Sequence, residues 1–93
     1  DFNVRIKKDT TADQINDAVR SAADSGSLKG ILEYSTLPIV STDIIGNSHS
    51  SIFDAPFTRV IDGNFIKTLN WYDNEWGYSN RVVDLVSLLC NVG

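Results

Sequence analysis

The sequence has few of the features that mark secreted, membrane-spanning or nucleic-acid-binding proteins. Cys90 is the single cysteine among 93 residues, which excludes an internal disulfide and favours a reducing compartment. No apolar run approaches the about 18 residues that cross a bilayer, and no signal-peptide pattern opens the chain. Twelve acidic against eight basic residues give a net charge of -4, which disfavours nucleic acid and anionic membranes as partners. We therefore expect a cytoplasmic protein.

Several motifs that would carry chemistry are also missing. There is no Gly-x-Gly-x-x-Gly loop, so the chain cannot bind a dinucleotide's pyrophosphate in the usual way. One cysteine and one histidine are too few for a structural zinc site, so we predict no metal. A dyad of Cys90 and His49 would need both groups within hydrogen-bond reach. Because Cys90 has no basic neighbour in sequence, we expect it to be a small buried hydrophobe instead.

The composition is that of a folded domain. Hydrophobic residues make up 42% and charged residues 22%, close to the globular average and far from the disordered class. The chain opens at Asp1 without a methionine and directly in an alternating pattern, so we interpret it as a portion of a longer polypeptide. Its length allows one small domain or a piece of a larger one.

The first third of the chain predicts a strand followed by a helix. Apolar and polar residues alternate from Phe2 to Ile6, as in a half-buried strand. Thr11 and Gln14 have the spacing of a capping box, in which each side chain satisfies the other residue's free backbone N–H. Apolar residues then follow at helical spacing, and Gly26 is placed to end the helix in a left-handed turn.

The remainder predicts several short strands and a final helix. We expect strands at 31–34, 39–45, 52–53, 59–61 and 65–72, with Asp62-Gly63 as a hairpin turn. Val82, Leu85, Val86 and Leu89 fall on one face of a terminal amphipathic helix. The pattern is α+β: a mixed, mostly antiparallel sheet packed by helices.

The stretch WYDNEWGYSN, residues 71–80, has an unusual composition. Its aromatic rings are too many for a solvated loop, and its acids and amides are too many for a core. A half apolar, half hydrogen-bonding surface is typical of a small-molecule pocket. Because the stretch joins the last predicted strand to the last helix, we expect it at the rim of the sheet, where ligands commonly bind.

Residues 71–85, WYDNEWGYSNRVVDL, closely resemble the C-terminal signature of phosphorylating glyceraldehyde-3-phosphate dehydrogenases. The resemblance extends upstream through LKGILEY at 28–34, VSTD at 40–43 and HSSIFDA at 49–55. It implies that residues 1–93 are the C-terminal part of the catalytic domain of a two-domain dehydrogenase. The family's N-terminal dinucleotide-binding domain lies outside this sequence, and the final helix is expected to pack on it.

The resemblance also implies a reaction and its participants. In this glycolytic family a cysteine thiolate attacks glyceraldehyde 3-phosphate, a hydride passes to NAD, and phosphate releases 1,3-bisphosphoglycerate. The family's Ser-Cys-Thr-Thr-Asn nucleophile motif and its activating histidine are not in this chain. We therefore assign no catalytic residue here, and expect these residues alone to be inactive. NAD is the expected cofactor, with NADP left open, and a homotetramer is the expected assembly, with contacts from residues 39–45.

By the same resemblance, Asn74 and Tyr78 are the cofactor-binding residues. Asn74 would pair its amide with the nicotinamide carboxamide, and Tyr78 would lie behind the nicotinamide ring. From the residues alone, Asn74 could instead cap the final helix and Tyr78 could pack in a core. We expect Asp73 and Glu75 to be structural, and the tryptophans of this stretch, Trp71 and Trp76, to pack within the enzyme.

Two alternative functions remain open at this point. Erythrose-4-phosphate dehydrogenase shares much of the signature and is a variant within the same family. A non-catalytic module is the other alternative, in which a partner covers the aromatic surface of residues 71–80.

Overall fold

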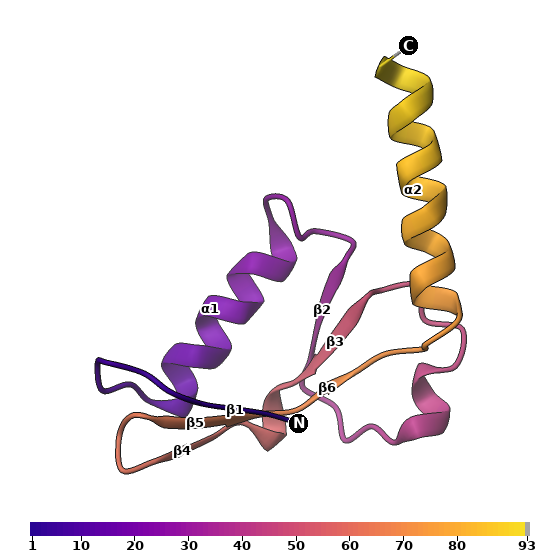
Figure 1. The fold of residues 1–93 in the computed structure, drawn as a ribbon. Helices are drawn as coiled ribbons and strands as arrows, with labels where there is room; N and C mark the ends of the chain where they lie inside the picture. Colours follow the sequence, from indigo (N-terminus) through magenta and orange to yellow (C-terminus); the bar gives the residue numbers. More distant parts are fainter. Residues whose placement is uncertain (93) are drawn as a thin grey trace.

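Two small sheets and two α-helices form the described part of the chain, residues 1–92 of the computed structural model (Figure 1). The architecture is α+β, as the sequence predicts. In chain order the elements are β1 (Phe2–Arg5), α1 (Ala12–Asp24), β2 (Leu32–Ser35), the 3₁₀ turn η1 (Ser41–Ile44), β3 (Ser51–Asp54), the 3₁₀ turn η2 (Ala55–Phe57), β4 (Arg59–Ile61), β5 (Phe65–Thr68), β6 (Asn70–Trp71) and α2 (Trp76–Val92).

The first sheet has the order β1-β5-β4 and is wholly antiparallel. Its centre is Ile66, which pairs with Val4 on one side and Val60 on the other and is buried. The loop between β4 and β5 contains Asp62 and Gly63 with φ of 54° and 80°, so both residues adopt the left-handed conformation. The predicted hairpin is confirmed.

The second sheet has the order β2-β3-β6, with β2 and β3 parallel and β3 and β6 antiparallel. Between the two sheets the chain passes through Leu69: Thr68 pairs with Phe2 in the first sheet, whereas Asn70 pairs with Phe53 in the second. The expected single strand over 65–72 is therefore wrong. The burial pattern changes phase at the crossing: Ile66 and Thr68 are buried in β5, whereas in β6 Trp71 is less exposed than Asn70.

Helix α1 begins and ends as the sequence predicts. The backbone N–H of Gln14 donates to Thr11 Oγ1 at 3.2 Å, and the Gln14 side chain accepts from the Thr11 N–H at 3.2 Å. After the helix, Gly26 adopts φ of 82°, in the left-handed region that a residue with a Cβ rarely enters. Asn16 accepts from Thr58 Oγ1 at 2.7 Å, which ties α1 to the segment after η2.

Residues 39–45, expected as a strand, contain the 3₁₀ turn η1 (Ser41–Ile44) instead. Pro38 precedes the segment and lacks the N–H that a central strand needs. Asp43 then folds the chain back: its Oδ2 accepts from the Val40 N–H at 2.8 Å, and its own N–H donates to the Val40 carbonyl at 2.9 Å. Ile44 is buried while Val40 and Ile45 are exposed, which no period-two pattern would give.

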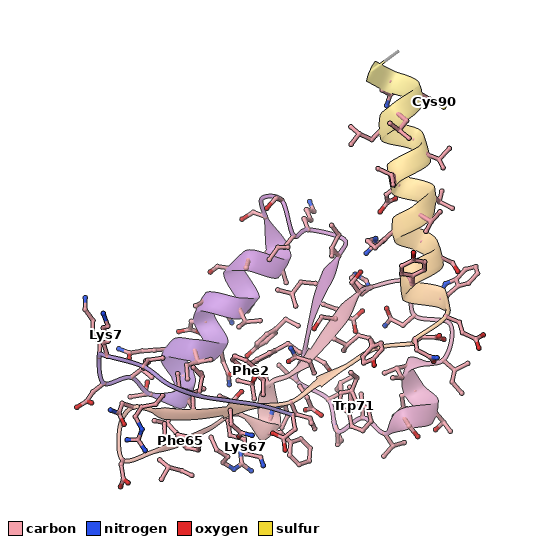
Figure 2. The ribbon with its side chains drawn as sticks, in the orientation of Figure 1. Phe2, Lys7, Phe65, Lys67, Trp71 and Cys90 are labelled. Carbon is pink, nitrogen blue, oxygen red and sulfur yellow. The ribbon has the colours of Figure 1, made fainter. Side chains whose placement is uncertain are left out.

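The core lies around β3, where Ile52 is 1% exposed and Asp54 is fully buried. Helix α2 projects away from both sheets, and Cys90 lies near its free end (Figures 1 and 2). Cys90 is exposed, contrary to the expected burial, because no residue among 1–92 covers that part of the helix. Within the same residues, neither helix has the length and apolar character that crossing a membrane requires.

Candidate functional site

Two hollows meet at the junction between β6 and α2. Both are lined by Tyr72, Asp73 and Asn74. The larger, about 410 Å³, extends over η1. The smaller, about 290 Å³, extends along the first turns of α2 and includes Tyr78. The structure therefore brings both predicted site residues, Asn74 and Tyr78, to one hollow. The further lining residues are Ser41, Ile44, Ile45 and Glu75 in the larger hollow and Ser50, Gly77 and Arg81 in the smaller.

Asp73, and not Asn74, caps helix α2. The Asp73 carbonyl accepts from the Gly77 N–H at 3.1 Å, which is the first helical hydrogen bond. Its side-chain Oδ1 accepts from the N–H groups of Glu75 at 3.0 Å and Trp76 at 2.9 Å, the positions that a capping oxygen reaches. The alternative in which Asn74 is the cap is therefore wrong, and the structural role expected of Asp73 is confirmed.

The second carboxylate oxygen of Asp73 reaches a different part of the chain. Oδ2 accepts from the Gly46 N–H at 2.9 Å, in the loop after η1. The N–H of Trp76, then that of Gly46, holds the pKa of the Asp73 carboxyl below its usual range, with a smaller contribution from Glu75. The carboxylate is therefore ionised at neutral pH, and negative charge at a helix N-terminus is favourable.

A close backbone contact seats the start of α2 on the loop before β3. A Cβ placed on Gly77 would lie 3.0 Å from the carbonyl oxygen of His49 and 3.7 Å from Ser50 Cα. A residue with a Cβ would have to push this backbone away by a few tenths of an ångström. The contact sets the distance between the helix and residues 49–50, and this distance defines the wall of the smaller hollow.

Arg81 completes that wall and was not selected from the sequence. Its Nη1 donates to Ser50 Oγ at 3.1 Å, and its Nε lies 3.0 Å from an Asp84 carboxylate oxygen. The spacing of 74, 77, 78 and 81 is i, i+3, i+4, i+7, one face of a helix, so the sequence did contain a signal for Arg81. The sequence contained no such signal for Ser50, which only the fold brings next to Arg81.

Strand β6 is held at its end by a hydrogen bond from Trp71 to a buried carboxylate. Trp71 Nε1 donates to Asp54 Oδ2 at 2.9 Å, and Asp54 is fully buried (Trp71 is labelled in Figure 2). Oδ1 of Asp54 has no hydrogen-bond partner among residues 1–92. Trp71 thus packs as expected and fixes the strand that leads into the site. Trp76 is 50% exposed among residues 1–92, so its packing elsewhere in the enzyme stays a prediction.

His49 has a structural environment. Its Nδ1 lies 2.9 Å from Asn47 Oδ1 and 3.3 Å from Glu33 Oε1, while the Asn47 side chain also accepts from the His49 backbone N–H at 2.9 Å. These contacts hold the loop against β2. No hydrogen bond joins His49 to Cys90 within residues 1–92, so the structure does not bring these two residues together.

The arrangement leaves one amide and one aromatic ring available at the smaller hollow. Within residues 1–92 no hydrogen bond engages the Asn74 side chain, which is exposed and carries one C=O acceptor and an NH₂ donor. Tyr78 is 72% exposed. These groups fit a planar ligand that carries a neutral amide. They do not include a nucleophile with a base beside it.

Comparison with known proteins identifies relatives over nearly all of the sequence. The family described as "Glyceraldehyde 3-phosphate dehydrogenase, C-terminal domain" matches residues 1–74. Curated relatives named glyceraldehyde-3-phosphate dehydrogenase include those of Kitasatospora aureofaciens, 55% identical over 96% of this chain, and Thermotoga maritima, 54% identical over 96%. A maize relative described as cytosolic is 56% identical over 92% of the chain. The chain spans about a quarter of the relatives' length, 26% of the first two and 25% of the maize protein.

Proposed function

The chain belongs to the glyceraldehyde-3-phosphate dehydrogenase family through that family's C-terminal domain, and on this premise we propose that it supplies the nicotinamide-side wall of such an enzyme. The enzyme, called the full-length enzyme below, is a chain of the relatives' length that contains these residues in its catalytic domain. It oxidises glyceraldehyde 3-phosphate to 1,3-bisphosphoglycerate with phosphate and NAD in cytoplasmic glycolysis. Its nucleophile and base come from outside these residues.

One observation carries this proposal: the Asn74 amide is free because Asp73 performs the capping. Asp73 and Asn74, just before α2, are two candidate caps, and the N–H groups of Glu75 and Trp76 donate to Asp73. The Asn74 side chain is therefore not needed to satisfy the helix. Its C=O and NH₂ can both pair with a carboxamide, which offers the complementary NH₂ and C=O.

The residues of the smaller hollow then have separate tasks. Bound NAD supplies the hydride acceptor. Asn74 fixes the rotation of an amide-bearing ring, and Tyr78 offers a flat apolar surface beside it. Orientation of this kind contributes up to about 7–11 kcal/mol to lowering a barrier when the reacting groups are fully aligned. Nothing in these tasks distinguishes NAD from NADP, because the residues act only at the nicotinamide end.

We also propose that the rest of the enzyme covers helix α2. Leu85, Val86 and Leu89 are 55%, 54% and 63% exposed, and apolar surface of this extent marks a contact. The dinucleotide-binding domain of the same chain is the proposed partner. A homotetramer is the proposed assembly, with the exposed side chains of Val40 and Ile45 at a subunit contact.

The test is Asn74→Ala in the full-length enzyme. Loss of two hydrogen bonds to a neutral group, each worth about 0.5–1.5 kcal/mol, predicts weaker NAD binding and a fall in kcat/KM of roughly ten- to a hundredfold. The melting temperature should stay near that of the parent, because Asp73 still caps α2. Reactivity of the catalytic thiol should also stay normal, because no contact assigns Asn74 to activating it.

The matched control is Asn3→Ala, which removes an exposed asparagine from β1. It should leave NAD binding and hydride transfer unchanged. The proposal would be refuted if Asn74→Ala melted at a lower temperature but transferred hydride and bound NAD like the parent.

A further inference from the structure

The carboxylate of Asp73 connects two segments that are far apart in sequence. Oδ1 accepts from Glu75 and Trp76 at the start of α2, and Oδ2 accepts from Gly46, 27 residues earlier, at 2.9 Å. A capping residue needs only the first of these contacts. The contact with Gly46 therefore does something other than begin the helix.

Asn74 lies within the turn that Asp73 forms at the start of α2. Oδ1 of Asp73 closes a turn onto the Glu75 N–H, and Asn74 is the residue enclosed by that turn. The backbone of Asn74 is thereby fixed, and a fixed backbone restricts the side chain to few rotamers. Gly46 is in the loop that follows η1, and residues of η1 line the larger hollow on the other side of Asn74.

Other contacts seat the helix without involving this carboxylate. Gly77 lies against His49, and Arg81 donates to Ser50 at 3.1 Å. Helix α2 thus keeps its place on residues 49–50 if the contact with Gly46 is lost. The contact between Asp73 and Gly46 instead sets how the residues before the helix, including Asn74, lie relative to η1.

We propose that Asp73 is a positioning residue that holds the Asn74 amide at the ligand-facing rim by joining the α2 N-terminus to Gly46. The inference rests on the proposed function, because positioning matters only if Asn74 binds the nicotinamide carboxamide. Asp73 lines both hollows, and we assign its carboxylate to holding Asn74 rather than to a ligand. Both of its oxygens are occupied by backbone N–H groups, so its effect passes through Asn74.

The test uses Asp73→Ser in the full-length enzyme. Serine is also a good capping residue, but its hydroxyl is too short to serve α2 and Gly46 together. The readout is the affinity for NAD divided by the affinity for ADP-ribose, which lacks the nicotinamide. We expect this ratio to fall about two- to twelvefold, the range for one hydrogen bond. Amide hydrogen exchange should become faster at Gly46 and stay near normal at Trp76.

A double-mutant cycle with Asn74→Ala separates this inference from the proposed function. If Asn74→Ala leaves the ratio unchanged, the proposed function fails. If Asn74→Ala lowers the ratio but Asp73→Ser does not, Asp73 is only a cap and this inference alone is overturned. If Asp73→Ser lowers the ratio equally in the Asn74→Ala background, Asp73 does not act through Asn74, and the inference is again overturned.

Two further variants keep the result interpretable. Thr11→Ala removes the cap of α1, far from the site in the chain, and should leave the ratio at the parental value. Asp73→Asn keeps the shape of the side chain but has one acceptor oxygen for two sets of donors, so it should lower the ratio as the serine variant does. If Asp73→Ser lowers the yield of folded enzyme, the asparagine variant decides: an unchanged ratio overturns the inference.

Discussion

Replacing Gly77 by alanine tests how the helix is seated against residues 49–50. The new Cβ would lie 3.0 Å from the His49 carbonyl oxygen, closer than the roughly 3.3–3.6 Å of a weak C–H···O contact. In an open helix, Gly→Ala stabilises by about 0.8–1 kcal/mol through propensity. Here the obstacle is backbone, which cannot rotate away, and overpacking costs about 1–3 kcal/mol. The net expectation is a destabilisation of about 0–2 kcal/mol with displacement of the helix start.

The displacement distinguishes Gly77→Ala from a simple stability change. Because Asn74 and Tyr78 move with the helix while Ser50 does not, NAD affinity should fall relative to ADP-ribose affinity. Ser21→Ala, at an exposed position of α1, is the control and should stabilise by a few tenths of a kcal/mol without changing that ratio. An enzyme in which Gly77→Ala raised the melting temperature and bound NAD normally would refute the account of the contact.

Two further predictions concern groups beside the site. Trp71→Phe leaves Asp54 Oδ2 buried without its N–H donor. The free energy of local opening, measured by hydrogen exchange of the Asp54 amide, should fall by about 1–3 kcal/mol. An unchanged exchange rate would contradict the pairing of Trp71 with Asp54. Because the Asp73 pKa is lowered in the fold, its contribution to stability is complete above about pH 3.9 and is lost as pH falls through the lowered value. Below about pH 4 the stability of the parent enzyme should therefore fall more steeply with pH than that of Asp73→Ser. Parallel acid unfolding curves for the two proteins would contradict this prediction.

The sequence predicts those elements whose hydrogen bonds are local. The capping box of Thr11 and Gln14, the left-handed Gly26 and the Asp62-Gly63 turn each depend on a few neighbouring residues, and all three are present. The broad α+β class follows from the same periodicities.

The sequence does not predict where the chain leaves one sheet for another. Residues 65–72 contain neither glycine nor proline to mark a break, yet Thr68 and Asn70 belong to different sheets, because strand propensity indicates an extended segment and not its partner. Likewise, the apolar residues of 39–45 suggest a strand, while the contact between Asp43 and Val40 selects a 3₁₀ turn. A side-chain acceptor soon after a proline, here Asp43 after Pro38, is a local signal for a turn, and hydrophobic periodicity does not detect it.

The candidate site was predictable in part. The composition of residues 71–80 indicates a pocket, and the resemblance to the dehydrogenase family names Asn74 and Tyr78. Which residue caps α2 is undecidable from Asp-Asn alone, since both types are good caps. The structure identifies Asp73 as the cap through its hydrogen bonds, one of which joins it to Gly46, 27 residues earlier.

A crystal structure of the full-length enzyme with NAD would show directly whether Asn74 binds the nicotinamide carboxamide. The quantity to measure is the distance from the Asn74 side-chain nitrogen and oxygen to the nicotinamide carboxamide. We predict hydrogen bonds of about 2.7–3.2 Å between these groups, with Asp73 still accepting from Gly46 and Trp76. An Asn74 amide that pairs with protein groups instead, while the carboxamide lies beyond hydrogen-bond distance, would contradict it.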